Sequence, residues 1–184
     1  MAVTLVSGVT GVGLSSVCQT VRRQLGDGYK LINFGDVMLE QAATSGVVAE
    51  RRELGTLSQT QTRRLQRRAG EFVADEARRT NVILSTHLAV ETRAGYIQGF
   101  PDEVLDDVSP TTFALVEASP ETIIERRRDG DRDTPAASER KIAFEQDLNR
   151  SAALQIARTQ NAPVRFIENE GSVEEAAERL VEAL

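Results

Sequence analysis

A glycine-rich loop near the amino terminus carries the clearest chemical signal in this sequence. It lies within VTLVSGVTGVGLSSV, residues 3–17, where Gly8, Gly13 and Ser15 match the phosphate-binding pattern G-x-x-x-x-G-K-[ST]. A strand that ends in such a turn and opens a helix brings free backbone N–H groups and the positive helix end together. We therefore predict that the loop binds nucleotide phosphates and that Ser15 offers its hydroxyl to Mg²⁺. The predicted binding residues are Gly8, Val9, Thr10, Gly11, Val12, Gly13, Leu14, Ser15 and Ser16.

The loop departs from that pattern at one position, because Leu14 stands where the lysine is expected. Its loss removes one cation, but backbone amides, the helix end, Mg²⁺ and arginines from elsewhere can still hold phosphate charge. The dinucleotide fingerprint G-x-G-x-x-G does not fit, since Ser16 follows Gly11 and Gly13 where the third glycine belongs. The loop therefore favours a phosphate site over a Rossmann domain.

Arginines in the second half of the chain form a second group with a chemical use. Arg126, Arg127 and Arg128 close a predicted helix, Arg132 lies in the polar segment that follows, and Arg150 lies on the next helix. Cations on a closing lid stabilise a phosphoryl group in transfer and exclude water. Cations at the carboxyl end of a helix also interact favourably with the helix dipole, which explains part of the run Arg126–Arg128. We expect at least two of the five to contact phosphate.

Other polar residues leave alternatives open. The stripe Arg63, Arg64, Arg67 and Arg68 is more typical of a solvated helix face than of a site. Arg51 and its neighbour Arg52 precede that helix, where an acceptor phosphate could be held. His87 ends the third predicted strand, where the sites of open sheets collect, although a lone histidine is more often structural. Cys18 lies beside the apolar face of the first helix and is most simply a core residue.

Alternating strands and helices must position these groups. Apolar runs predict strands within residues 2–8, 29–36, 81–87, 111–119 and 162–169. Helical spacing predicts helices over 14–25, 36–45, 58–80 and 138–159, one that starts at 120 and a last one that starts near 172. The longest of the early helices places Leu65, Ala69, Phe72, Val73 and Ala77 on one face. This order predicts an α/β fold, a five-stranded parallel sheet with helices on both faces. We expect one domain over residues 1–184, interrupted by insertions at 35–58 and 129–138.

Composition limits the class of protein. The chain has 184 residues, one cysteine, one histidine and a net charge of −6, with Lys30 and Lys141 as its only lysines. An acidic surface argues against nonspecific nucleic-acid binding, and one cysteine with one histidine gives no structural zinc pattern. No apolar run approaches the roughly 18 residues of a membrane span, and the sequence starts without a signal-peptide pattern. We expect a cytoplasmic protein that binds neither membrane nor nucleic acid.

Several motifs together resemble the archaeal-type adenylate kinases. They are VSGVTGVG, INFGDVMLE, STHLAVETRAGYIQGFP, VEASPETIIERRRD and DLNRSAA, which run from end to end of the chain. The resemblance implies the phosphate-loop kinase fold, in which residues 35–58 form the acceptor-binding insertion and residues 129–138 a short lid. It also implies phosphoryl transfer from ATP, with Mg²⁺, to AMP, giving two ADP, and a homotrimer.

The resemblance assigns residues on both sides of the reaction. Arg51 matches an arginine of the acceptor side, while Arg126, Arg132 and Arg150 match positions around the lid and are the predicted catalytic residues. The chain also departs from the family at named positions. Leu14 replaces the loop lysine, Ser85 replaces an aspartate that would hold water on Mg²⁺, Gly55 replaces a second acceptor-side arginine, and the lid is about one residue short.

These departures leave two other functions open. Leu14 and Ser85 together would suit a catalytically silent nucleotide-binding protein that changes shape or partner when it binds a nucleotide. A kinase for another small acceptor on the same fold would carry the same loop. Calorimetry and a panel of acceptors separate these functions from the first.

Overall fold

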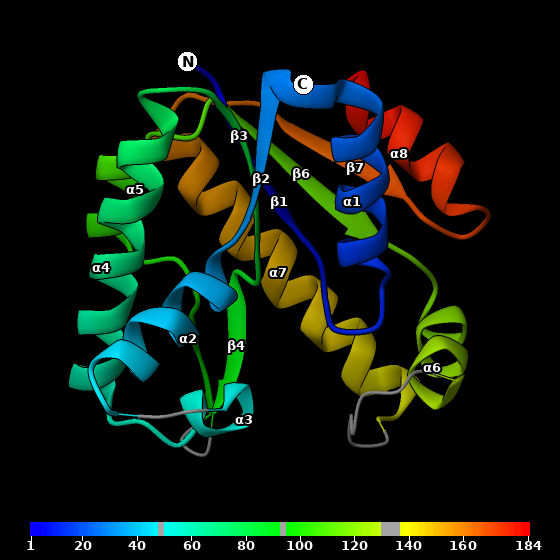
Figure 1. Ribbon diagram of the computed structural model, residues 1–184. Coiled ribbons are helices and arrows are strands. Elements are labelled where there is room, and N and C mark those ends of the chain that lie inside the picture. The colour runs from blue at the N-terminus through cyan, green and yellow to red at the C-terminus, as the bar shows by residue number, and fades with distance from the viewer. Residues whose placement is uncertain (48–49, 93–94, 130–136) are drawn as a thin grey trace.

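A five-stranded parallel sheet forms the centre of the molecule (Figure 1). The computed structural model describes residues 1–47, 50–92, 95–129 and 137–184, with only the backbone of residues 51 and 52. The strand order is β2-β3-β1-β6-β7, and all neighbours are parallel, which confirms the predicted sheet. The strands are β1 Val3–Ser7, β2 Tyr29–Asn33, β3 Asn81–Thr86, β6 Thr112–Glu117 and β7 Val164–Glu168.

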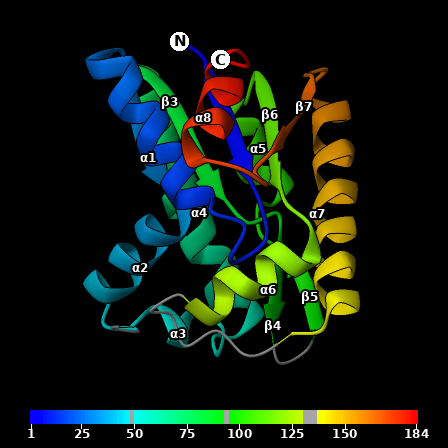
Figure 2. The ribbon, with the colours of Figure 1, turned by 90° about the vertical axis from the view of Figure 1, so that its right-hand side faces the viewer.

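Helices cover both faces of this sheet, as the sequence predicts. Helices α4, α5 and α7 pack on one face, and α1 and α8 pack on the other (Figures 1 and 2). Helices α2, α3 and α6 lie at the carboxyl end of the sheet, away from the two chain termini (Figure 1). The helices are α1 Leu14–Leu25, the 3₁₀ turn η1 Gly26–Gly28, α2 Phe34–Thr44, α3 Arg51–Leu54, α4 Gln59–Ala77, α5 Asp102–Val108, α6 Pro120–Asp129, α7 Glu139–Thr159 and α8 Val173–Val181.

Alternate residues of each central strand enter different cores. In β1, Val3 and Leu5 join the core beneath α4, α5 and α7, while Val6 joins the core beneath α1 and α8. In β6, Phe113 joins the first of these cores and Val116 joins the second. Both faces of a parallel sheet are buried, so its strands read as continuous apolar runs without alternation. This is why the strands could be found from sequence. In the described part of the chain, no helix is long and apolar enough to cross a membrane.

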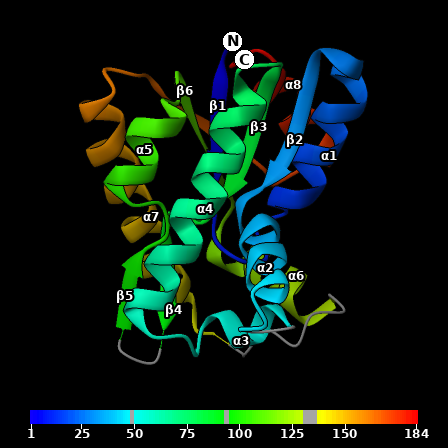
Figure 3. The same cartoon turned by 60° about the vertical axis from the view of Figure 1, so that its left-hand side comes forward.

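A two-stranded antiparallel hairpin and helix α5, which follows it, are elements that the sequence pattern did not predict. Strands β4 Ala89–Thr92 and β5 Gly95–Gln98 lie near α3, at the carboxyl end of the sheet (Figure 3). Each strand has only four residues and neither has a buried face, so no apolar period marks them. The hairpin closes tightly on its stem, since a Cβ on Gly99 would lie 1.9 Å from the carbonyl oxygen of His87.

Helix α2 begins two residues earlier than the sequence predicts, so Phe34 and Gly35 are helical and do not extend β2. The cause is a side-chain cap, in which Oδ1 of Asn33 accepts a hydrogen bond from the backbone N–H of Asp36 at 3.1 Å. Phe34 thereby enters the core, where its ring lies 5.0 Å from the ring of Phe100.

Replacing Asn33 with alanine should lower the free energy of unfolding by about 1 kcal/mol, because the first turn of α2 loses its acceptor. Urea denaturation of both proteins measures this difference. Asn33→Asp keeps an acceptor at the same place and serves as the control, so its midpoint should stay close to that of the unchanged protein. An equal loss in both variants would contradict the capping role.

One residue of the predicted buried face of α4 is misplaced. Leu65, Ala69 and Val73 are buried as expected, but the side chain of Phe72 is 38% exposed. Its ring lies at the edge of the buried stripe, with the Nζ atom of Lys30 5.7 Å from its centroid. The turn of α4 beside it packs Gly70 against Val104 of α5, so the helix is rotated toward its small residues and away from Phe72.

Candidate functional site

The glycine-rich loop joins β1 to α1 and turns with two left-handed glycines. The φ angles are 87° at Gly11 and 91° at Gly13, which L side chains rarely adopt. Gly13 is also the N-cap of α1 and has no side chain with which to cap it. Among the residues that the structure describes, no side chain accepts a hydrogen bond from the first-turn N–H groups of α1. This end of α1 is therefore suited to an anion.

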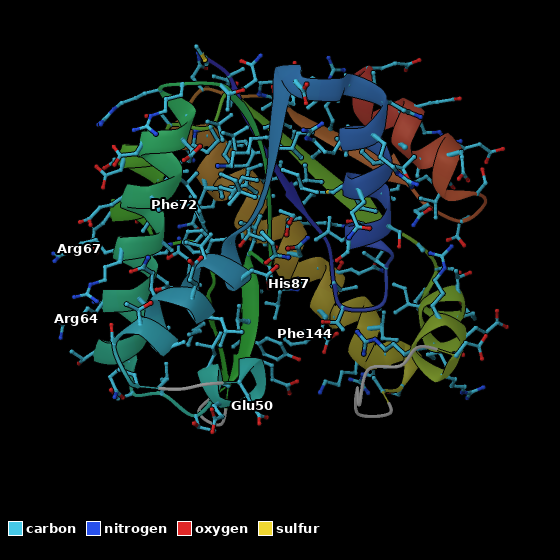
Figure 4. All side chains as sticks on the ribbon, viewed as in Figure 1. Glu50, Arg64, Arg67, Phe72, His87 and Phe144 are labelled. Atoms are coloured by element: carbon cyan, nitrogen blue, oxygen red, sulfur yellow. The ribbon has the colours of Figure 1, made fainter. Side chains whose placement is uncertain are left out.

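Two carbonyl groups at the start of the loop are held by side chains from distant elements. The Nδ1 atom of His87, at the end of β3, lies 2.7 Å from the carbonyl oxygen of Gly8 and donates to it, because a carbonyl can only accept. Figure 4 shows His87 beside the loop. The Nε atom of Arg127, on α6, donates to the carbonyl oxygen of Thr10 at 2.9 Å. His87 thus holds the backbone of the loop, a structural contact that agrees with the commoner expectation for a lone histidine.

A third carbonyl group, that of Val12, is held by two donors. The Nδ2 atom of Asn169 donates to it at 2.7 Å, and the Nη1 atom of Arg126 at 3.2 Å. Arg126 also donates to the carbonyl oxygen of Asn169 at 2.8 Å, and the N–H of Asn169 donates to that of Glu117. These bonds occupy three carbonyl groups along the loop and fix its path. Within the loop the N–H of Val12 donates to the carbonyl oxygen of Val9 at 3.2 Å, and the N–H groups at the start of α1 are the ones suited to an anion.

The leucine at the lysine position is part of the core. Leu14 is 9% exposed and belongs to the same apolar cluster as Val17, Cys18 and Val21 of α1. Burial raises the pKa of the Cys18 thiol to about 12, so this cysteine stays protonated and unreactive. The loop therefore presents main-chain donors without a lysine ammonium group.

The residues suited to a metal are few. Ser15 lies in the first turn of α1 with a partly exposed side chain, which agrees with a hydroxyl ligand to a phosphate-bound ion. Ser85 is 4% exposed, and its Oγ donates to the carbonyl oxygen of Ile32 at 3.4 Å. Within the described ranges, no cluster of histidine, cysteine or carboxylate side chains could hold a metal by itself. Among the described residues, the hydroxyl of Ser15 would hold Mg²⁺ together with bound phosphates.

Arg150, predicted to contact phosphate, is bound to carboxylates. Its Nε donates to Oε1 and Oε2 of Glu117 at 2.8 and 3.0 Å, and its Nη2 donates to Oε2 as well. Its Nη1 donates to Asp147 at 2.8 Å. Glu117 ends β6 and is 4% exposed, whereas the side chain of Arg150 is 46% exposed. The hydrogen bond that Arg150 donates to Glu117, with the charges of Glu117 and Asp147, raises the pKa of Arg150, so its guanidinium stays charged.

The remaining predicted residues are less fully described. Arg132 and most of the segment 129–138 lie outside the described residues, and of Arg51 only its place at the start of α3 is described. Three arginines of the α4 stripe face solvent, as expected, and Figure 4 shows Arg64 and Arg67 pointing outward. The fourth, Arg68, is half-buried and donates to Oγ of Ser45 at 2.9 Å.

Three residues that hold the loop or its arginines were missed from sequence. Glu117 and Asn169 directly end or follow parallel strands, and sites of open sheets gather at that edge, so their positions were an available signal. Glu145 accepts a hydrogen bond from Arg127 at 3.0 Å in the interior of α7, where no local pattern marks it.

Comparisons with known proteins agree with this geometry. A family model described as an AAA domain matches residues 7–143. The chain is similar to the adenylate kinase of Thermococcus kodakarensis, with 37% identity covering 99% of this chain and 94% of that protein. It is also 37% identical to the adenylate kinase of Methanopyrus kandleri, covering 99% of this chain and 97% of that protein.

Solved structures support the fold alone. A gluconokinase from Sinorhizobium meliloti matches with a TM-score of 0.56 and 16% identity, covering 99% of this chain and 90% of that one. The Thermus thermophilus protein TT1252 matches with a TM-score of 0.57 and 18% identity, covering 99% and 95%.

Proposed function

From the premise that this chain belongs to the adenylate kinase family, we propose that it transfers a phosphoryl group reversibly from MgATP to AMP, giving two ADP. The observation that carries the proposal is the uncapped amino end of α1 behind a loop whose carbonyl groups are held from outside. Such a loop binds the donor phosphates through N–H groups fixed before the nucleotide arrives.

The proposed mechanism needs positioning and charge, with no covalent enzyme intermediate. The loop from Gly8 to Ser16 holds the donor phosphates, and the hydroxyl of Ser15 would hold Mg²⁺ bound with them. Mg²⁺ held with the donor phosphates would supply charge neutralisation during the transfer. We assign to Arg150, which donates to Glu117 at the carboxyl end of β6, the positive charge for the phosphoryl group in transfer. Arg126 acts through Val12, by fixing the loop.

The acceptor side and the lid are assigned by the same proposal. Residues 35–58, which contain most of α2 and all of α3, form the acceptor-binding insertion, in which Arg51 meets the AMP phosphate. Residues 129–138, with Arg132, form the lid that closes over the donor. Cytoplasmic location and a homotrimer stay predictions from the sequence.

An assay with MgATP and AMP tests this function directly. We expect ADP to form from both substrates and its formation to stop when a chelator in excess removes Mg²⁺, because the donor phosphate charge is then unscreened. The assay should be run at low and at molar potassium salt, since the acidic, lysine-poor composition suits either condition. Absence of ADP at both salt concentrations would overturn the proposal.

If the protein is instead a catalytically silent nucleotide-binding protein, we expect a different result under the same assay conditions. Calorimetry would then show tight binding of ATP or AMP without turnover. The double variant Leu14→Lys with Ser85→Asp restores both family residues and tests why the activity is absent. A panel of acceptors in place of AMP identifies a kinase of another specificity.

A further inference from the structure

We propose that Arg127 and Glu145 are positioning residues for the donor phosphates, with Arg127 fixing the loop at Thr10 and Glu145 fixing Arg127. The inference rests on the proposed function. It gives the second arginine of the 126–128 run a task other than direct phosphate contact. It also gives Glu145, which no sequence pattern marks, a part in the site.

The first step is the contact between Arg127 and the loop. Its Nε donates to the carbonyl oxygen of Thr10 at 2.9 Å, and its side chain is 9% exposed. The stem of the arginine packs on Gly11, where an added Cβ would lie 2.7 Å from Cγ of Arg127. A peptide plane whose carbonyl is held outward carries its N–H, on Gly11, in the opposite direction. Arg127 therefore sets the direction of a loop N–H.

The second step is the contact between Arg127 and Glu145. Its Nη2 donates to Oε2 of Glu145 at 3.0 Å, and the side chain of Glu145 is 15% exposed. A guanidinium held by a carboxylate on one edge and a carbonyl on another has little freedom to rotate. The pair is nearly buried, so either partner alone would be a costly uncompensated charge.

The third step connects the pair to the hairpin. Oε1 of Glu145 accepts a hydrogen bond from the Tyr96 hydroxyl at 3.2 Å. Burial, and then the charge of Glu145, raise the pKa of Tyr96, so its phenol stays protonated and donates. The Tyr96 ring also packs on Phe144, with centroids 5.7 Å apart, and Lys141 binds Glu91 at 2.9 Å. Figure 2 shows α6 and the hairpin below the sheet, near the lower part of α7, and Figure 4 labels Phe144 on α7.

A single variant gives the first test. Arg127→Met keeps the apolar stem and removes the donors, so the KM and the calorimetric Kd for ATP should rise by about 10-fold to 100-fold, as when outer partners of a bound group are removed. The KM for AMP should stay unchanged, because Arg127 holds only the donor loop. Arg127→Lys, which retains one donor, should recover part of the ATP affinity. Arg158→Met, exposed at the far end of α7, is the charge-matched control.

A double variant separates positioning from simple stabilisation. Arg127→Met with Glu145→Leu replaces the pair by apolar groups, which should restore the denaturation midpoint that Arg127→Met lowers. ATP affinity should stay weak, because Thr10 still lacks its donor. Recovery of ATP affinity together with stability would overturn the positioning role, and so would unchanged ATP affinity in a folded Arg127→Met.

The calorimetric Kd for ATP tests the role of Arg127 independently of the proposed phosphoryl transfer, because it is measured without turnover. Unchanged protein that binds ATP but makes no ADP would overturn the phosphoryl transfer, and the Kd values of the variants would still decide the role of Arg127. Unchanged protein that binds no ATP would overturn both.

Discussion

Gly13→Ala is expected to lower kcat/KM for ATP on the order of 100-fold to 1,000-fold, comparable to the loss of one preorganised donor at a charged transition state. Gly13 has a φ of 91°, and a Cβ there would lie 2.6 Å from Nδ2 of Asn169. That nitrogen holds the Val12 carbonyl, and Asn169 is 1% exposed, so it has no room to retreat. The loop must therefore change its path at the point where α1 offers its N–H groups.

A second glycine supplies the control for this substitution. Gly28 lies in η1, has no left-handed φ, and a Cβ there would meet no atom within 4 Å. Gly28→Ala should leave kcat/KM unchanged in the assay with MgATP and AMP. Circular dichroism of both variants checks that the sheet and helices persist. If Gly13→Ala remained folded with full activity, the loop would not be the donor site.

Arg150→Met is expected to lower kcat on the order of 100-fold to 1,000-fold, because the charge beside the transferring phosphoryl group is lost. It should also destabilise the protein by about 2 kcal/mol, since Glu117 is left as a buried carboxylate without its partner. The value is set below the range for a fully buried pair because the side chain of Arg150 is 46% exposed. Steady-state kinetics and urea denaturation measure the two effects.

Glu117→Gln distinguishes the two effects of Arg150. It removes the charge of the partner but leaves Arg150 in place, still bound by Asp147. This variant should be destabilised and yet retain far more of its kcat than Arg150→Met. An equal fall of kcat in both would show that Arg150 acts only by holding Glu117.

The proposed site needs no lysine, because the positive charge that would meet the phosphates is spread over several backbone and side-chain groups. In the loop, phosphate would meet backbone N–H groups and the end of α1, whose directions are fixed by donors from β3, α6 and the turn after β7. Preorganised dipoles of this kind need no reorganisation when charge develops. Leu14 then adds to the core that holds α1 in place.

The amino-acid sequence alone determined those elements of the protein that carry a regular local pattern of residues. Buried parallel strands are visible as apolar runs, helices as apolar residues at helical spacing, and the loop at 8–16 by its glycines. The positions of the five sheet strands and of this loop in the chain were therefore predicted correctly. The hairpin was not predicted, because its four-residue strands bury no face and show no apolar period. The short helix α5, the capped start of α2 and the exposure of Phe72 were not predicted either.

Only the tertiary structure decided which partner each charged side chain has. Arg126, Arg127 and Arg150 were all visible as cations, but two of them bind loop carbonyl groups and the third binds Glu117. Arg127 and Thr10 are 117 positions apart in the chain, and Asn169 and Val12 are 157 apart. A hydrogen bond depends on distance and direction in space, and sequence spacing sets these only within a single helix, strand or turn.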